Sequence, residues 1–440
     1  MLKRILDKIL LASALLVLAF TGAGAQTYGS YTPYSIFGVG DMAAPGTAFN
    51  KTMGGVGIAT RNNRFLNPVN PAAVTARDTL AFMADYSLFQ DNKLFRQGDM
   101  RSASNTVNIG DLLISFPIYK SSAMMVGLMP LSNTGYGYSY DVTDPAIIGR
   151  TGNINYTAGG RGGVYQLFAS AGVTFWRRLS VGAEFIYNFG KISKTFTESF
   201  SDASYNGASN GNTIQMRAPA GKFGLQYDQP LGTKTTLTLG ATYRTRSKIG
   251  GYTENYRFST GTAASDTLYY NKNFPSDVYI ASEKGIGLSV RHADKLSFEL
   301  DYTRSDWRDS GLDTAEGFTG NLTAGTARSS FSTALSESWR AGFEITPNRN
   351  DIRYYLRTVT YRAGAYWKNE YYRIDGNPVN AFGITLGATF PVFRWHNGIT
   401  FGMEFGQRGS LKNNMILERY MNFSVGFNLF DIWFQKFAYD

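Results

Sequence analysis

From residue 79 onward the chain repeats one pattern, in which apolar residues alternate with polar or small residues until turn-forming residues interrupt. One example is the run Ile399-Thr400-Phe401-Gly402-Met403-Glu404-Phe405. A period of two places successive side chains on opposite faces of a β-strand. The pattern therefore predicts strands with one apolar face and one polar or small face, and no long helix.

Fourteen such segments occur between residue 79 and the C-terminus. They cover residues 79–90, 105–118, 122–132, 163–176, 179–190, 214–228, 235–247, 278–292, 295–305, 337–346, 352–368, 379–392, 397–407 and 420–434. The connections between them alternate in length along the chain. Short turns are expected near residues 119–121, 177–178, 229–234, 293–294, 347–351 and 393–396, and long loops over 91–104, 133–162, 191–213, 248–277, 306–336, 369–378 and 408–419.

An even number of strands, with short turns at one end and long loops at the other, is typical of outer-membrane β-barrels. A soluble β-sandwich or a β-propeller is the alternative, because both are also rich in alternating strands. A propeller would show a blade signature at a fixed period, and none is visible. A sandwich has no reason to segregate long loops to one end. We therefore expect an all-β fold: a transmembrane antiparallel β-barrel of about 14 strands, with residues 79–440 as the barrel.

The alternation also assigns the two faces of the barrel wall. A cation that faces lipid at the middle of the bilayer costs about 2–4 kcal/mol, so charged residues should face the lumen. The residues predicted to line the lumen are Glu184, Arg244, Arg291, Glu299, Asp301, Arg340, Glu344 and Glu404. Glycines on the same face would leave room for an element packed against the wall.

The first 25 residues have the features of a cleavable secretory signal peptide. A basic start that contains Lys3, Arg4 and Lys8 precedes an apolar stretch over 9–20 and the small residues at 23–25. A membrane-spanning helix needs about 20 apolar residues, so this stretch is too short to serve as one. A short buried helix is the alternative interpretation. Export and Gln26 as the mature N-terminus are predicted.

Residues 26–78 do not alternate, and they are rich in glycine and Asn-Pro pairs, which mark tight turns. Irregular backbone at membrane depth is tolerated only inside the protein. We therefore predict an N-terminal hatch, or plug, in the lumen; its apolar content argues against a disordered extension. The residues singled out for this hatch are Gly54, Gly55, Asn67, Pro68, Asn70, Pro71 and Ala72.

These features together resemble the FadL/TodX-type outer-membrane transport proteins. The resemblance is based on the signal peptide, the small-residue stretch 53–59, Asn70-Pro71-Ala72 before the first strand, and the strand count. The C-terminal strand and its aromatic tail, with Trp433, Phe434 and Phe437, extend the resemblance over the mature chain. It implies a fourteen-stranded barrel with an internal hatch. The opening at 35–41 is similar to a divergent branch of that family, some of whose relatives are accessory barrels of secretion or assembly machines.

Two functions remain open at this point. The resemblance implies passive transport of a hydrophobic small molecule, with lateral exit at a kink in the third strand. Gly127 and Pro130 are the candidate residues for such a gap, since proline cannot donate to the ladder and glycine weakens pairing. A strand end marked by Pro130 is the alternative. The second function is a non-transporting accessory barrel of an outer-membrane secretion or protein-assembly complex. Long loops rich in Tyr, Asn, Gly and Ser suit protein recognition.

Composition limits the chemistry further. The chain has no cysteine and two histidines, His292 and His396, both at expected short turns. This composition argues against thiol chemistry and against an enzyme of the Ser–His or Asp–His type. We expect no metal and no cofactor. The formal charge of +10 falls to +8 after signal removal, because the signal carries three bases and one acid. Basic residues are scattered among acids, so the expected surroundings are outer-membrane lipid and lipopolysaccharide rather than nucleic acid. The other expected partners are a hydrophobic ligand and envelope proteins that bind at the long extracellular loops.

Overall fold

A computed structural model describes residues 29–78, 80–202, 204–260, 265–273, 277–320, 330–392 and 397–432. The predicted signal peptide at 1–25, Gln26, His396 and the aromatic tail with Trp433, Phe434 and Phe437 lie outside the described residues. In the described part, no helix has the length and apolar character needed to cross a membrane.

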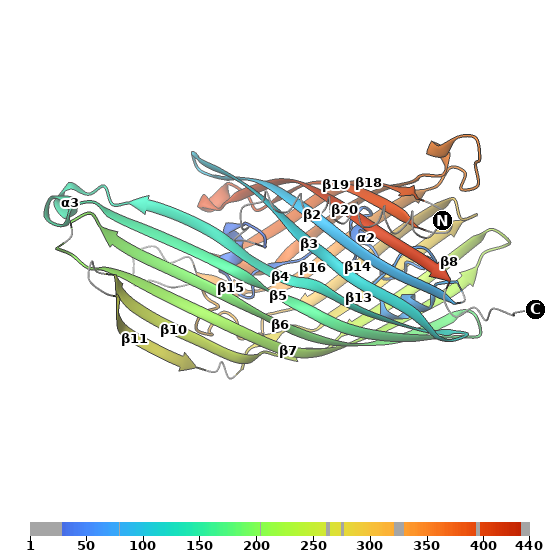
Figure 1. Ribbon diagram of the computed structural model, residues 1–440, viewed down its shortest axis with the longest axis horizontal. Coiled ribbons are helices and arrows are strands. Elements are labelled where there is room, and N and C mark those ends of the chain that lie inside the picture. The colour runs from blue at the N-terminus through green and yellow to red at the C-terminus, as the bar shows by residue number, and fades with distance from the viewer. Residues whose placement is uncertain are drawn as a thin grey trace, which may run out of the picture.

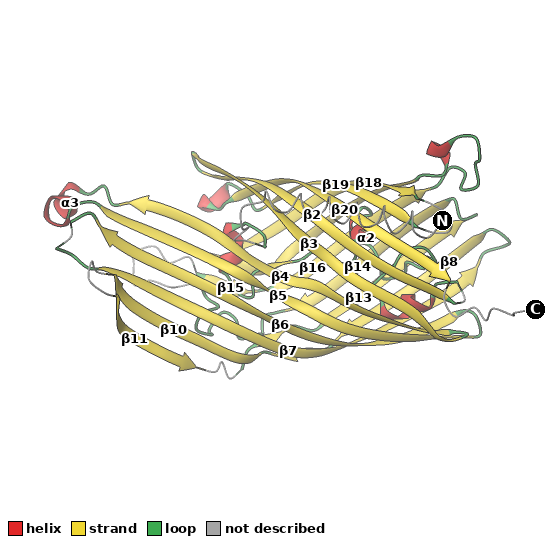
Figure 2. Cartoon of the chain, viewed as in Figure 1, coloured by secondary structure: helices red, strands yellow, loops and turns green. Residues whose placement is uncertain are grey.

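The described chain is a closed antiparallel β-barrel (Figures 1 and 2). The barrel strands are β2 (Ala81–Gln97), β3 (Met100–Tyr119), β4 (Ser122–Asp141), β5 (Ile154–Phe175), β6 (Leu179–Phe200), β7 (Gly207–Pro230), β8 (Thr235–Arg244), β10 (Gly250–Thr260), β11 (Ser265–Asn273), β13 (Glu283–His292), β14 (Leu296–Asp306), β15 (Phe331–Thr333), β16 (Leu335–Ile345), β17 (Thr360–Ile374), β18 (Asn377–Pro391), β19 (Gly398–Arg408) and β20 (Leu417–Ile432). β8 with β10, β11 with β13, and β15 with β16 each form one interrupted strand, which gives the fourteen strands that the alternation predicts.

Pairing of the last strand with the first closes the barrel. β20 pairs with β2 from Ala81–Ile432 to Arg96–Leu417. We call the end of the barrel at Ala81 and Ile432 the inner end, and the end with the β2–β3 turn at residues 98–99 the outer end. Short elements complete the fold: β1 (Asp41–Met42), β9 (Ser247–Lys248), β12 (Tyr279–Ile280), α2 (Ala48–Lys51), α3 (Pro145–Thr151), η1 (Pro33–Ile36), η2 (Pro71–Thr75), η3 (Tyr355–Arg357) and η4 (Lys412–Asn414).

The predicted long loops are largely wrong, because most of their residues continue the strands. The ranges 91–104, 133–162, 191–213, 248–277 and 369–378 are mainly strand, and β4 to β7 project as a tall wall beyond the rest of the barrel (Figure 1). These extensions pair through their backbones, and outside a membrane a strand needs no apolar face. Their Gly, Ser, Asn and Thr content therefore resembles that of loops although the backbone ladder continues.

The eleventh strand also begins later than predicted. The alternation predicts a strand over 352–368, but β17 starts at Thr360, so the turn predicted at 347–351 spans 346–359. Asp351 explains the difference, because its Oδ1 accepts hydrogen bonds from the backbone N–H groups of Arg353 (2.9 Å) and Tyr354 (2.8 Å). This local hydrogen bonding competes with strand pairing.

The two faces of the wall follow the predicted alternation. On β14, Phe298 and Leu300 are exposed on the outside, whereas Glu299 and Asp301 are buried on the inside. Exposed isoleucines and phenylalanines continue this outer apolar surface on other strands, for example Ile286 on β13 and Ile384 on β18. The outer face therefore suits hydrocarbon, and the charged groups face the interior.

Candidate functional site

The N-terminal segment 29–78 is held together by its asparagines and turns. Asn67 Nδ2 donates to the carbonyl of Gly57 at 2.7 Å, and its Oδ1 accepts from the N–H of Val69 at 3.1 Å. Asn50 at the end of the first turn of α2 accepts from the N–H of Thr47 at 3.0 Å. Asn70 begins η2, where its Oδ1 accepts from the N–H of Ala72 at 3.0 Å. Buried amides thus replace the backbone ladder that this irregular segment lacks.

The same segment contacts wall strands on many sides of the barrel. The N–H groups of Gly57 and Ile58 donate to Asp301 of β14 at 2.7 and 2.9 Å. The N–H of Gly54 donates to Thr385 of β18 at 2.8 Å. Arg61 forms an ion pair with Asp228 of β7 at 2.9 Å. These contacts reach strands around the circumference, so residues 29–78 lie within the ring of strands (Figure 1).

Inner-wall glycines allow this close approach. A side chain at Gly364 of β17 would overlap the backbone of Met53 and Gly54, and a Cβ at Gly342 of β16 would lie 2.8 Å from the Met53 carbonyl oxygen. Pro71 and Ala72 likewise lie directly against Gly182 of β6. The small inner face thus fits the backbone of the N-terminal segment. That residues 26–78 act as a separate hatch domain stays a prediction.

A buried cluster of charges ties the N-terminal segment to four strands near the outer end. Arg408 of β19 contacts Asp41 at 2.5 Å and Glu418 of β20 at 2.8 Å. Lys93 of β2 lies 3.3 Å from Glu418 and 3.6 Å from Asp41. Arg408 Nη2 also donates to Thr32 Oγ1 at 3.0 Å. Glu370 and Lys368 of β17, whose charged groups lie 2.8 Å apart, complete the cluster. Its three basic side chains therefore balance its three carboxylates.

The pKa of Asp41 makes this cluster sensitive to acid. Burial acts to raise that pKa, but Arg408 and Lys93 outweigh burial and hold it below its usual value. A carboxyl whose folded pKa is lowered stabilises the fold above its unfolded pKa and loses this contribution as the pH falls through the folded value. We expect the difference in melting temperature between the wild type and Asp41→Asn to stay constant from about pH 8 to about pH 5 and to shrink below about pH 4. Thermal unfolding in detergent measures it, and a difference unchanged down to pH 3 would contradict the assignment.

Apolar packing covers the outer opening above this cluster. Phe37 and Val39 belong to a buried group with Trp307, Leu312 and Phe318 of the segment after β14. The N–H of Gly38 donates to the carbonyl of Phe318 at 2.8 Å. The rings of Trp307 and Tyr371 of β17 lie 4.6 Å apart. The described part of the β14–β15 connection thus packs on the N-terminal segment across the mouth of the barrel.

Lys194 of β6 joins these two layers from the opposite wall. Its Nζ donates to the carbonyl of Ile36 at 2.6 Å and to that of Gly317 at 2.8 Å. The side chain is almost fully buried. Since a buried ammonium needs such partners, this contact fixes the N-terminal segment and the covering segment together.

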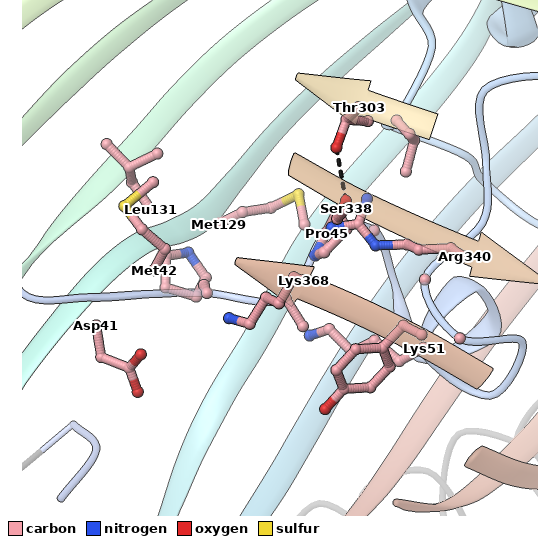
Figure 3. A pocket seen from close by; sticks show the side chains of 18 of the residues that line it. Asp41, Met42, Pro45, Lys51, Met129, Leu131, Thr303, Ser338, Arg340 and Lys368 are labelled. Carbon is pink, nitrogen blue, oxygen red and sulfur yellow. Dashed lines mark hydrogen bonds between the residues drawn. The ribbon is translucent and has the colours of Figure 1, made fainter. Parts of the chain in front are cut away.

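A cavity of about 350 Å³ lies below this cover, and its lining is strongly charged. Seven acidic and seven basic residues line it, among them Lys51, Arg340 and Lys368 (Figure 3). Met129 and Leu131 of β4 form an apolar part of the lining (Figure 3). Burial lowers the pKa of Lys51 to about 8, although the negative charges of Asp111 and other carboxylates act to raise it. Lys51 Nζ also lies 3.6 Å from the centre of the Phe89 ring.

The pairing between β3 and β4 ends next to this cavity. Their pairing runs from Tyr119–Ser122 at the inner end to Leu112–Leu128, and toward the outer end the two strands separate (Figure 1). Beyond this point β4 pairs instead with β1, at Asn133–Asp41 and Ser132–Met42. The ladder thus ends two residues before Pro130, and the register between β4 and β5 shifts directly after it. Gly127 lies just inside the paired part, opposite Leu113.

The charged residues predicted for the lumen all lie on the inward register of their strands. They do not form one site. Asp301 and Glu299 hold the N-terminal segment, and Thr60 donates to Glu299. Glu344 pairs with Arg362 at 2.8 Å, whereas Glu404 accepts from Tyr366 and Asn422. The remaining four lie along the wall: Glu184, Arg244 and Arg340 at the cavity, and Arg291 near the inner end, 4.0 Å from Asp294.

Most of the buried charge cluster was not predicted from the sequence. Lys93, Glu370 and Glu418 fall within ranges that were predicted to be loops, as does Arg408. Their strands continue through these ranges, so the same alternation extended by a few residues would have placed all four on the inner face. Asp41 was noted only as the end of the motif at 35–41.

The described residues contain no group of three or more His, Cys, Asp or Glu side chains that could hold a metal. His292 is exposed at the end of β13, where its Nδ1 lies 2.8 Å from Thr235 Oγ1.

Together these features define an outer-membrane β-barrel of FadL-like fold whose interior is occupied by residues 29–78. The family model called BamG matches residues 1–440, and the chain belongs to that family. Among curated proteins none matches the chain.

Several solved channels share the fold. The monoaromatic hydrocarbon channel CymD has 13% identity and a TM-score of 0.58, over 88% of this chain and 97% of that one. The Ralstonia pickettii toluene transporter TbuX has 14% identity and a TM-score of 0.59, over 88% and 98%. The Pseudomonas putida toluene transporter TodX has 13% identity and a TM-score of 0.58, over 89% and 100%. At this identity the likeness concerns the fold alone.

Proposed function

We propose that this barrel is a closed, non-transporting partner subunit of an outer-membrane secretion or protein-assembly complex. The observation that carries the proposal is the double closure of the lumen: the charged cluster around Arg408 ties the N-terminal segment to four strands, and the Trp307–Phe318 segment packs over it. A hydrophobic solute would have to pass both layers and then a cavity lined by fourteen charged residues. Membership of the BamG family also favours an assembly-related role over transport.

Uptake of a hydrophobic small molecule is the second candidate, favoured by a specific observation. β3 and β4 are not paired with each other beyond Leu112–Leu128, and Met129 and Leu131, directly after this last pair on β4, line the cavity. CymD, which has the same fold, is described as a monoaromatic hydrocarbon channel, and TbuX and TodX as toluene transporters. An apolar solute could leave laterally there if the layers above it moved.

Purification from native outer membranes separates the two functions. We expect the affinity-tagged full chain, extracted in mild detergent, to elute with another envelope protein at a fixed stoichiometry in native mass spectrometry. The same tag on an unrelated outer-membrane barrel controls for non-specific association. A barrel that elutes alone, with a bound hydrophobic small molecule, would contradict the partner role and support uptake.

A further inference from the structure

The turn between β16 and β17, residues 346–359, presents apolar side chains to the outside at the inner end of the barrel. Ile352 is fully exposed, Leu356 is 64% exposed, and Tyr354 and Tyr355 are about half exposed. The turn is nevertheless ordered, because Asp351 accepts hydrogen bonds from two of its backbone N–H groups and η3 follows directly. Large apolar side chains that lie together outside an ordered turn indicate an interaction surface.

This turn extends sideways from the barrel, on the side of the wall that faces lipid (Figure 1, orange, upper right). Tyr361 lies on the outward register of β17, and its hydroxyl donates to the carbonyl of Leu356 at 3.0 Å. The hydroxyl of Tyr355 donates to the carbonyl of Pro391, at the end of β18, at 2.9 Å. These contacts place the exposed side chains of the turn beside the apolar outer surface, where the strands end.

Three arginines accompany the apolar side chains, at positions 349, 353 and 357. The turn has one carboxylate, Asp351, which lies 3.4 Å from Arg357, so three positive charges against one negative charge leave an excess of positive charge. The guanidinium groups of Arg353 and Arg357 lie over the same ring, 5.3 and 4.8 Å from the centre of Tyr354. Two guanidinium groups beside one ring suit a phosphate group, because their N–H groups donate in the fork geometry that phosphate accepts.

Other turns at the same end repeat this combination of an exposed ring and basic residues. Trp176, between β5 and β6, is 83% exposed and is followed by Arg177 and Arg178. Tyr119, at the end of β3, is 69% exposed and precedes Lys120. Aromatic residues gather where a membrane protein crosses the boundary between hydrocarbon and water. The turns of the inner end therefore lie at the level of lipid headgroups, and their shortness indicates the periplasmic side.

We propose that the turn at 346–359 binds an anionic phospholipid of the membrane leaflet at the inner end. Arg353 and Arg357 hold the phosphate of the headgroup, and Ile352 and Leu356 lie against the first carbons of the acyl chains. Burial of apolar side chains in a leaflet and attraction of basic residues to its anionic lipids reinforce each other. This inference goes beyond the proposed partner role and does not depend on it, because lipid surrounds the barrel in either candidate function.

Other occupants fit the turn less well. Tyr355 and Tyr361 hold the turn beside the lipid-facing surface and not across the mouth of the barrel, so lipid is the neighbour that its exposed side chains meet. A periplasmic protein that docked there would first have to displace this lipid. Free phosphate would satisfy the two arginines but would leave Ile352 and Leu356 exposed to water.

Fluorescence quenching in liposomes tests this site, and the absence of cysteine from the chain allows a single labelled position. Ile352→Cys carries a bimane label, and the full chain is reconstituted into phosphatidylethanolamine liposomes with spin-labelled phosphatidylglycerol or spin-labelled phosphatidylcholine. We expect phosphatidylglycerol to quench the label at about 30-fold lower mole fraction, since each of two basic residues near an anionic lipid contributes about fivefold. Equal quenching by the two lipids, or a label that neither lipid quenches, would overturn the proposal.

Two paired substitutions in the labelled protein locate the effect. Arg353→Gln with Arg357→Gln should remove the preference for phosphatidylglycerol. Arg96→Gln with Arg101→Gln, the matched control, removes two exposed arginines near the outer end and should leave the preference unchanged. A preference that survives the first pair would contradict the assignment to these arginines. In cells, Ile352→p-benzoylphenylalanine should crosslink to phospholipid, and a crosslink to a protein instead would show that the turn is a protein-docking surface.

Discussion

Arg408→Met should release the N-terminal segment from the barrel wall and produce the largest loss of stability of any single substitution considered. The guanidinium contacts Asp41, Glu418 and Glu370, and its side chain is almost fully buried. Removing one partner from a buried ionic group leaves uncompensated charge and costs about 3–5 kcal/mol. The strands themselves are held by backbone ladders, which the substitution of the Arg408 side chain leaves in place, so the barrel should remain folded.

Limited proteolysis and thermal unfolding in detergent measure this effect. We expect cleavage within residues 29–78 in the variant at protease concentrations that leave the wild type intact, together with a lower melting temperature. Arg308→Met is the matched control, since Arg308 pairs with Asp306 at the exposed surface and its loss should change neither measurement. A variant as resistant as the wild type would show that the charge cluster does not hold the segment.

Gly364→Val should have the second largest effect, because the new side chain would overlap backbone rather than a movable side chain. The new Cβ would overlap the backbone of Met53 and Gly54. The N–H of Gly54 donates a hydrogen bond to Thr385 Oγ1 at 2.8 Å. Overpacking of a close-packed interior costs about 1–3 kcal/mol, and here it would also separate that hydrogen bond. Displacement of the segment near Gly54 is therefore expected, with the barrel wall intact.

Gly221→Val is the matched control for this substitution. A Cβ at Gly221 of β7 would meet its nearest neighbours at 3.8 Å, an ordinary contact distance, and valine favours strands. Melting temperature and protease sensitivity should therefore stay at wild-type values in this variant. If Gly364→Val and Gly221→Val behave alike, the close approach of the segment to the inner wall does not contribute to stability.

The alternation of side chains was sufficient to predict the barrel and the direction of its charges. Phe298-Glu299-Leu300-Asp301 illustrates why: burial in lipid on one face and in protein on the other constrains each position separately. Outside the membrane this constraint ends. The outer parts of β4 to β7 carry glycine, serine and asparagine, so their length could not be predicted from apolar periodicity, and the loop predictions failed there.

The site was only partly predictable for a related reason. Asn67, Asn70 and Gly54 stand out locally, since Asn-Pro and Gly-Gly pairs mark turns whatever surrounds them. The partners of this segment are distant in sequence: Asp301 and Thr385 bind it because the barrel closes around it. No local pattern contains that information. The end of the β3–β4 pairing near Pro130 depends likewise on a distant segment, because β1 pairs with β4 directly beyond it. That Gly127 and Pro130 form a lateral gap stays a prediction.

Uptake of a hydrophobic solute across the outer membrane tests the central claim, a closed barrel, most directly. Radiolabelled toluene would be supplied to a host that lacks its own FadL-type channels and produces the full chain in its outer membrane. The closed interior predicts uptake equal to that of the same host without the barrel. Uptake clearly faster than that background would contradict the account, because it would show that a solute passes the N-terminal segment and the charged cavity in the wild-type protein.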